Sequence, residues 1–217
     1  RSEANRERVV ALGGVPVLLS LAMPWPWRPT ELLGGISRAM GSLTMSPAVR
    51  EEIAQQGGWK SLLALAQTRH EAVWFNTLRA LANLALHEPL EAHGPGMAKQ
   101  LLEAGALDIA ISFLSQRPSD VDLNIQAARL AGNLSVCCRD GSDAEATKPF
   151  SGPKFIRLLG EAATQAASAG GTTTTSSPAL HDYAVVYAKL SRIPAIALWL
   201  FDIVGVSVLE SFAAATG

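Results

Sequence analysis

The stretch Arg79-Ala80-Leu81-Ala82-Asn83-Leu84-Ala85 is the most informative part of the chain, because it recurs. A close copy follows as Arg129-Leu130-Ala131-Gly132-Asn133-Leu134-Ser135, and a weaker copy precedes it as Arg38-Ala39-Met40-Gly41-Ser42-Leu43-Thr44. We call these seven-residue stretches the repeat phrase. A helical phrase that recurs along one chain predicts an all-α protein whose units stack into a superhelix. Such a stack presents an extended groove, so we expect the repeated Arg and Asn side chains to hold another chain.

Glycines separate the repeated elements. Gly13, Gly57 and Gly105 are roughly 45 residues apart, within the period of about 40–47 residues that two- or three-helix solenoid units show. Each follows a short helical run, where glycine can adopt the left-handed conformation that ends a helix. After each glycine we expect a short apolar helix, at Val15–Met23, Trp59–Ala66 and Leu107–Leu114. A longer helix with the repeat phrase then follows, at Pro29–Met45, Glu71–His87 and Val121–Val136.

The repeats divide the chain into segments of similar length. We place them at residues 1–46, 47–88, 89–136 and 137–192, with a partial repeat at 193–217. The fourth repeat is looser, and its phrase reads Val185-Val186-Tyr187-Ala188-Lys189-Leu190-Ser191. A Gly-, Thr- and Ser-rich stretch at 169–178 has the composition of a flexible insertion. Because the chain begins at Arg1 and the last repeat is incomplete, we interpret it as a fragment or a processed form.

Composition excludes several classes of protein. The hydrophobic fraction of 48% predicts a packed chain, and a net charge of −1 argues against a dedicated nucleic-acid binder. The adjacent pair Cys137 and Cys138 provides no disulfide framework, which favours a reducing compartment, the cytoplasm or the nucleus. The apolar run 193–209 is short for a membrane helix and contains Pro194, Asp202 and Gly205. We therefore favour buried core helices there over a membrane span, which stays the alternative.

Catalytic motifs are not evident in the sequence. It contains no Gly-x-Ser-x-Gly elbow, no phosphate-binding loop and no His-Glu-x-x-His pair. The four histidines His70, His87, His93 and His181 are scattered, and residues 140–145 match a calcium loop poorly. We therefore expect no catalytic residue, no metal site and no cofactor, and we expect the chain not to be an enzyme.

The glycine turn, the apolar second helix and a third helix ending in Asn-Leu-small resemble the armadillo repeat family over most of the chain. The resemblance implies a right-handed α–α superhelix of three-helix units, with the third helices lining a concave groove. In that family the groove Asn binds the main chain of an extended peptide. Asn83 and Asn133 match this position, and Ser42 and Lys189 occupy it in the degenerate repeats.

This chain departs from the nuclear-import adaptors of that family, which carry Trp one helical turn before the Asn. Arg38, Arg79 and Arg129 stand there instead, on the same helix face as the Asn position. Because Arg matches carboxylate and phosphate geometry, we expect an acidic or phosphorylated protein or peptide partner instead of a basic one.

Two alternatives stay open at this point. Each Arg could instead pair with an acidic residue of the neighbouring repeat, and each Asn could cap an internal helix, although we favour groove exposure for the Asn residues. The chain could also be the regulatory or docking segment of a larger enzyme whose catalytic domain lies outside it.

Overall fold

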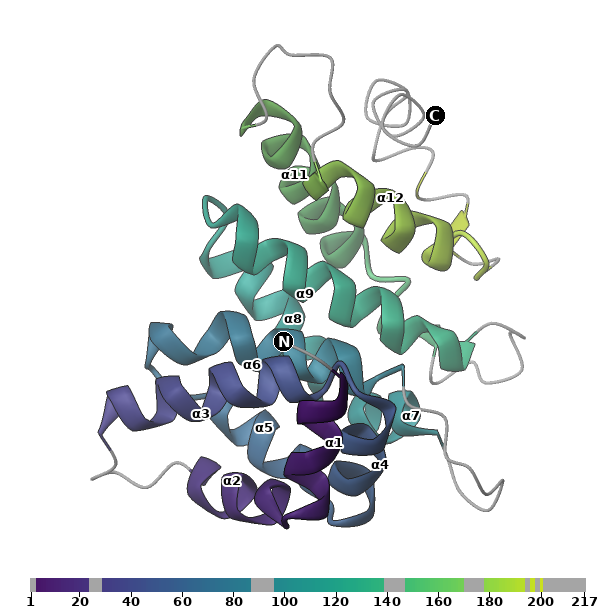
Figure 1. The fold of residues 1–217 in the computed structure, drawn as a ribbon. Coiled ribbons are helices and arrows are strands. Elements are labelled where there is room, and N and C mark those ends of the chain that lie inside the picture. The colour runs from purple at the N-terminus through teal and green to yellow at the C-terminus, as the bar shows by residue number, and fades with distance from the viewer. Residues whose placement is uncertain are drawn as a thin grey trace. The chain divides into compact units, whose positions relative to one another are not determined.

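The structure is a computed structural model that describes residues 3–23, 29–86, 96–138, 147–169 and 178–193, together with 196, 197 and 200. All regular elements in these ranges are helices, which confirms the predicted all-α class (Figure 1). The chain forms two compact units, Arg1–Ala106 (unit 1) and Leu107–Gly217 (unit 2). The 140–145 loop, His87, His93 and all but the ends of the 169–178 insertion lie outside the described residues.

Unit 1 repeats one order of helices, short, short and long. The first set is α1 (Glu3–Ala11), α2 (Gly14–Ala22) and α3 (Thr30–Leu43). The second set is α4 (Pro47–Gln55), α5 (Trp59–Ala66) and α6 (Glu71–Leu84), and α7 (Met97–Glu103) follows. The long helices α3 and α6 lie side by side, as Figure 1 shows. Both carry a copy of the repeat phrase at the carboxyl end.

The predicted glycine turns are present in the structure. Gly13, Gly57 and Gly105 have φ angles of 67°, 63° and 83°, and they are the positive-φ glycines among the described residues. Each angle lies in the left-handed region, which costs a residue with a side chain about 1–2 kcal/mol. Pro47 stands at the first position of α4, where its missing N–H leaves no hydrogen bond unmade. Local chemistry therefore sets where one helix stops and the next begins.

Helical spacing of apolar residues builds the core of unit 1. On α6, Val73, Ala80, Leu81 and Leu84 have no exposed surface, and they recur at steps of three, four and seven residues. This spacing places them on one side of the helix. The opposite side of α6 remains partly accessible and carries Arg79. Burial of the apolar stripe thus decides which side of each long helix stays available.

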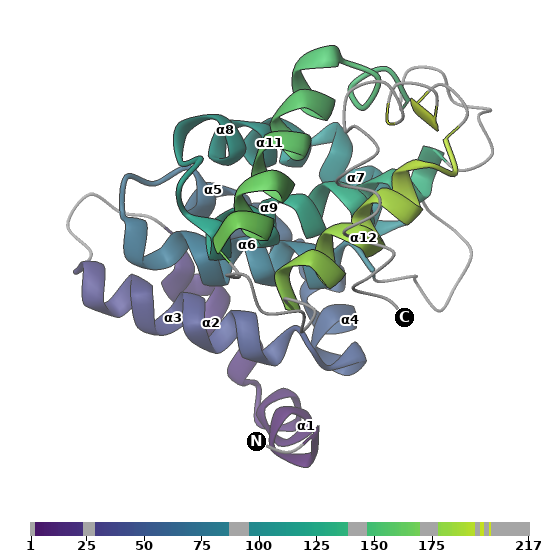
Figure 2. The same ribbon diagram turned by 90° about the horizontal axis from the view of Figure 1, so that it is seen from above.

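Unit 2 contains a second group of long helices. Its elements are α8 (Ala106–Gln116), α9 (Val121–Leu134), the 3-10 helix η1 (Ser135–Cys138), α11 (Pro153–Ala169) and α12 (Pro178–Leu190). Helix α12 packs on α9 and on α11, and Figure 2 shows α12 crossing this unit from a second direction. No disulfide joins Cys137 and Cys138, whose sulfur atoms lie 3.9 Å apart.

Little of the apolar run 193–209 is described. Ile193, Ile196 and Leu200 are buried, with exposed fractions of 0%, 0% and 5%, which agrees with the interpretation as core. None of the helices in the described ranges combines the length and the hydropathy that a membrane span requires. The boundaries of the five predicted repeats stay a prediction.

Candidate functional site

Arg79 is the best-ordered cation of the repeat phrase in unit 1. Its guanidinium lies over the Phe75 ring at 5.7 Å from the centroid, a cation–π contact within the same helix. Its Nε and Nη2 atoms also lie 3.0 Å from the place where a Cβ on Gly41 of α3 would stand. Glycine at the fourth position of the phrase in α3 therefore leaves room for the arginine of α6. Arg79 is half-buried as a result.

Arg38 and Ser42 occupy the equivalent positions on α3. Arg38 is exposed and Ser42 is half-buried. They lie one helical turn apart, so their side chains share a face of α3. The structure therefore keeps both predicted residues of this copy accessible.

Asn83 binds the neighbouring long helix. Its Nδ2 donates to Thr44 Oγ1 at 3.3 Å, and the Thr44 hydroxyl donates to the carbonyl oxygen of Met40 at 2.9 Å. Only 8% of Asn83 is exposed. The amide thus joins the carboxyl ends of α6 and α3.

Asn133 has a similar environment in unit 2. It is 3% exposed, and its Oδ1 accepts a hydrogen bond from the Lys189 ammonium of α12. Lys189 is half-buried. The two residues stand at the same position of two phrase copies, so the contact joins one long helix to the following one.

The structure corrects one expectation about the Asn residues. We expected Asn83 and Asn133 to face an open groove, and both are instead buried between two long helices of their own unit. The physical reason is the close packing of these helices. At such distances a short amide side chain reaches a polar group of the neighbouring helix, and a buried amide requires such a partner.

Arg129 follows the alternative that we left open for the arginines. Its Nη1 donates to Gln126 Oε1 at 3.3 Å, and its Nε lies 3.8 Å from Asp182 Oδ1 of α12. The side chains of Arg129 and Asp182 are 33% and 40% exposed. An ion pair this long and this exposed stabilises the fold by only about 0–1 kcal/mol. Arg129 is therefore held in place without being fully used by the contact.

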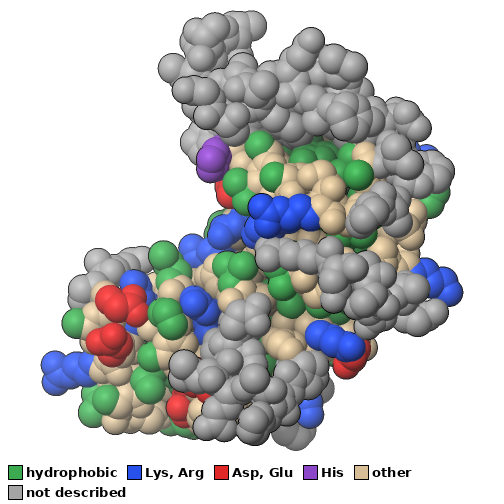
Figure 3. Space-filling view, turned by 90° about the vertical axis from the view of Figure 1, so that its right-hand side faces the viewer, with side chains coloured by type: hydrophobic (Ala, Val, Ile, Leu, Met, Phe, Trp, Pro, Cys, Tyr) green, Lys and Arg blue, Asp and Glu red, His purple; other side chains and the backbone are tan. Residues whose placement is uncertain are grey.

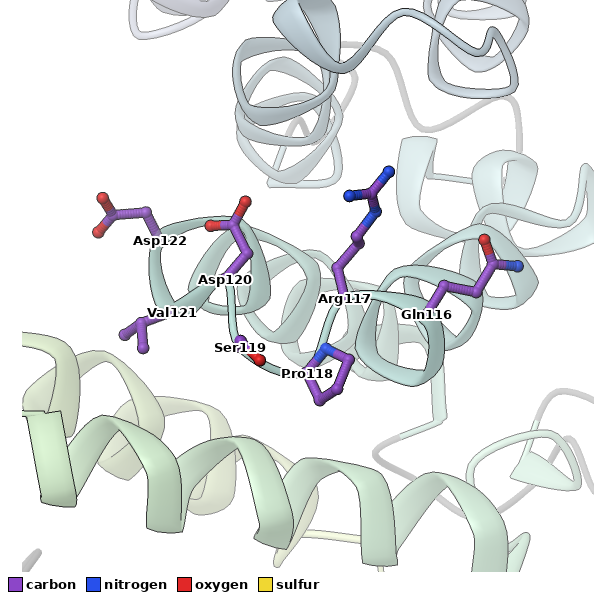
Figure 4. Close-up of a pocket in the computed structure, with 7 residues that line it drawn as sticks. All are labelled: Gln116, Arg117, Pro118, Ser119, Asp120, Val121 and Asp122. Atoms are coloured by element: carbon purple, nitrogen blue, oxygen red, sulfur yellow. The ribbon is translucent and has the colours of Figure 1, made fainter.

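A shallow pocket, which the sequence analysis did not identify, lies at the turn between α8 and α9. Its volume is about 660 Å³, and its lining is the continuous stretch Gln116, Arg117, Pro118, Ser119, Asp120, Val121 and Asp122. Figure 4 shows the side chains of Gln116, Arg117, Asp120 and Asp122 extending to the same side of the turn. A sequence signal existed, because Asp before an apolar helical run indicates a helix start.

Hydrogen bonds within the turn explain several of its polar groups. Asp120 Oδ1 accepts from the backbone N–H of Leu123 at 3.0 Å and caps α9. Asn124 Nδ2 donates to the carbonyl oxygens of Arg117 and Pro118, both at 2.9 Å. Within the described ranges no three His, Cys, Asp or Glu side chains are grouped so that they could hold a metal ion. We therefore assign this pocket a structural role.

Comparison with known proteins gives structural similarity only. No protein-family model matches the chain, and no curated protein sequence matches it. An engineered protein solved by the Northeast Structural Genomics Consortium is similar with a TM-score of 0.52 and 16% identity, over 93% of this chain and 96% of that one. A second engineered protein from the same consortium has a TM-score of 0.49 and 20% identity, over 93% and 94%. The designed armadillo repeat protein YIII(Dq)4CqI has a TM-score of 0.49 and 16% identity, over 93% and 98%.

Similarity at this level of identity concerns the fold and nothing more. The repeated order of two short helices and a long one, with glycine turns at matched places, agrees with it. The chain thus has an all-helical fold of the armadillo-repeat type.

Proposed function

We propose that this chain is a non-enzymatic scaffold that binds an extended acidic or phosphorylated segment of a protein partner along its long helices. One observation carries the proposal. Arg38, Arg79 and Arg129 stand at the same position of three phrase copies, and each keeps accessible surface. Guanidinium groups pair with carboxylates and phosphates through two parallel hydrogen bonds, which favours a ligand of this chemistry.

Arg79 is suited to such a ligand because it is held in advance. The Phe75 ring on one side and the Gly41 backbone on the other restrict the guanidinium. A side chain ordered before binding loses less conformational entropy when the ligand arrives. Arg38, which is exposed on α3, then supplies a second cation in the same unit.

In unit 2 the cations are Arg129 and Lys189. The distance of 3.8 Å between Arg129 and Asp182 leaves the guanidinium able to form a closer pair with a ligand carboxylate. Lys189 already donates to Asn133, so we assign it a supporting part in the charge of this surface. Lys and Arg side chains also reach the surface at several places on the face that Figure 3 shows.

Magnitudes require a ligand that contacts several cations. A hydrogen bond to a charged group contributes about 1.5–3 kcal/mol, whereas a micromolar complex needs about 8 kcal/mol. One arginine therefore supports only weak binding. We expect a short acidic peptide to bind poorly and a longer one to bind measurably.

Fluorescence anisotropy with labelled peptides tests the proposal. We would compare a glutamate-rich peptide, a phosphoserine peptide and a lysine-rich peptide of equal length. The acidic peptides should bind and the basic one should not. Arg79→Glu and Arg129→Glu should each weaken binding at least tenfold.

The matched control is Arg157→Glu on α11, whose side chain is 66% exposed and outside the repeat phrase. This variant has the same change in charge and should bind nearly as well as the unaltered chain. If Arg79→Glu and Arg157→Glu weakened binding equally, net charge would explain the effect and the proposed surface would be wrong.

A further inference from the structure

The long helices of each unit meet through one recurring contact. In unit 1, α6 packs on the glycines of α3: a Cβ on Gly41 would lie 2.9 Å from the Asn76 carbonyl oxygen, and one on Gly34 would lie 3.9 Å from Ala72 Cβ. In unit 2, α12 packs on α9 in the same way, with Val186 Cγ1 at 3.1 Å from a Cβ on Gly132. The fourth residue of the phrase thus faces the following long helix in both units.

The opposite side of α3 is uncovered. Leu32, Gly35 and Ala39 stand at the positions that Val73, Asn76 and Ala80 occupy on α6. Val73 and Ala80 have no exposed surface, whereas Leu32 is 39% exposed and Gly35 and Ala39 are half-buried. We call Leu32, Gly35 and Ala39 the leading face of α3.

Gly35 supports this interpretation independently. A glycine inside a helix is less stable than alanine by about 1 kcal/mol. Gly34 and Gly41 have a packing reason, since α6 lies against both. A Cβ on Gly35 would meet nothing within 4 Å. No contact within the described chain explains this glycine, and a second helix packed closely on the leading face would.

Helix α12 presents the complementary side. Ala188 occupies the phrase position of Gly41 and Gly132, and it is exposed. His181 and Ser191, at helical spacing from Ala188 on the same side, are exposed as well. We call these three residues the trailing face of α12. It is the side that carries the next long helix wherever the chain repeats the contact.

We propose that the leading face of α3 binds the trailing face of α12 from a second copy of this chain. Leu32, Gly35 and Ala39 would pack on Ala188 as Val186 packs on Gly132. A second copy is the occupant that the structure favours, because the two uncovered faces are the two halves of a contact that each unit already makes. The interface joins different faces, so each added copy leaves one of each uncovered and the assembly grows beyond a dimer.

Sedimentation velocity over a range of protein concentrations tests this assembly. The unaltered chain should show a sedimentation coefficient that rises with concentration past that of a dimer. Leu32→Glu removes the leading face and Ala188→Glu removes the trailing face, so each variant alone should stay monomeric. Both residues are exposed, and circular dichroism checks that each variant keeps its helices. Leu12→Glu, at a leucine that is 75% exposed in the turn before α2, is the matched control and should assemble like the unaltered chain.

Mixing the two variants gives the decisive result. The Ala188→Glu chain keeps a leading face and the Leu32→Glu chain keeps a trailing face, so an equimolar mixture should form a one-to-one dimer that does not grow. A monomeric unaltered chain at every concentration would overturn the proposal. So would self-association of the Leu32→Glu variant alone, or a mixture that stays monomeric.

Discussion

At the scale of single residues, glycine has two opposite effects on α3. Gly41 gives up helix stability so that Asn76 and Arg79 of α6 can approach. Gly35 gives up the same stability where the described chain places nothing against it. The two sites therefore separate the cost of glycine from the benefit of close packing.

Alanine at these two positions should change stability in opposite directions. Gly35→Ala should raise the free energy of unfolding by about 0.5–1 kcal/mol, because alanine is the better helix former. Gly41→Ala should lower it by about 1 kcal/mol or more, because the new methyl would lie 2.9 Å from a backbone oxygen and overpacking costs about 1–3 kcal/mol. Urea denaturation at a concentration where the chain is monomeric measures both, and equal effects would show that α3 and α6 are not packed this closely.

Gly57 tests the turns between helices. Its φ of 63° is in the left-handed region, and a methyl group added to its Cα would meet no atom within 4 Å. Gly57→Ala should therefore lower the free energy of unfolding by about 1–2 kcal/mol through backbone strain alone. Denaturant unfolding of this variant, beside Gly35→Ala as control, measures the loss. A neutral result would mean that the turn adopts another backbone conformation.

At the scale of helices, polar contacts fix how one long helix meets the next. Asn83 binds Thr44 between α6 and α3, and Asn133 binds Lys189 between α9 and α12. These contacts are specific in direction, whereas the apolar contacts beside them are not. We infer that the Asn of the phrase sets the alignment of neighbouring long helices.

A double-mutant cycle measures the contact between α9 and α12. Asn133→Ala and Lys189→Ala should each destabilise the chain, and their combined effect should be smaller than the sum. The coupling free energy should be about 1.5–3 kcal/mol, as for a hydrogen bond to a charged group. Lys189→Ala combined with Arg157→Ala on α11 is the control pair and should be additive. Additivity of the Asn133 pair would exclude the contact in solution.

At the scale of the whole molecule, the two tyrosines report on unit 2. Tyr183 and Tyr187 are the only tyrosines of the sequence, and both are buried. Burial, and then the nearby Asp182 carboxylate, raise the pKa of Tyr183 above its ordinary value. Burial, and then Tyr183, raise the pKa of Tyr187. Both hydroxyls thus hold their protons more tightly in the folded chain.

Stability should therefore fall at alkaline pH. A group whose pKa is raised by folding stabilises the fold fully below its ordinary pKa, here about 10, and this contribution is lost as the pH rises above that value. In a spectroscopic titration, tyrosinate absorbance should appear together with the loss of helix measured by circular dichroism. In denaturant it should appear near the ordinary pKa. Tyrosinate formation near pH 10 in the folded chain would contradict the burial of both hydroxyls.

The proposed ligand also makes a prediction for the whole chain, because Arg79 belongs to unit 1 and Arg129 to unit 2. If one long acidic peptide contacts both, the losses of binding free energy in Arg79→Glu and Arg129→Glu should add in the double variant. Calorimetric titration should then give one peptide per chain. Two peptides per chain, each sensitive to one arginine, would show separate sites.

The helices and their turns could be predicted from the amino-acid sequence alone. The repeat phrase, the glycine spacing and the three- and four-residue apolar steps predicted the all-α class, the order of short and long helices and the left-handed conformation of Gly13, Gly57 and Gly105. These features depend on backbone preference and on periodicity within about one helix, and both are written locally in the chain.

Which phrase residues stay accessible could be learned only from the packed helices. Asn83 and Asn133 recur as regularly as Arg79 in the sequence pattern, yet the Asn residues are buried and the arginine is not. Their partners Thr44 and Lys189 stand 39 and 56 residues away in the chain. Whether a side chain reaches such a partner depends on the distance between helices, which the packing at Gly41 and Gly132 sets and no local pattern encodes.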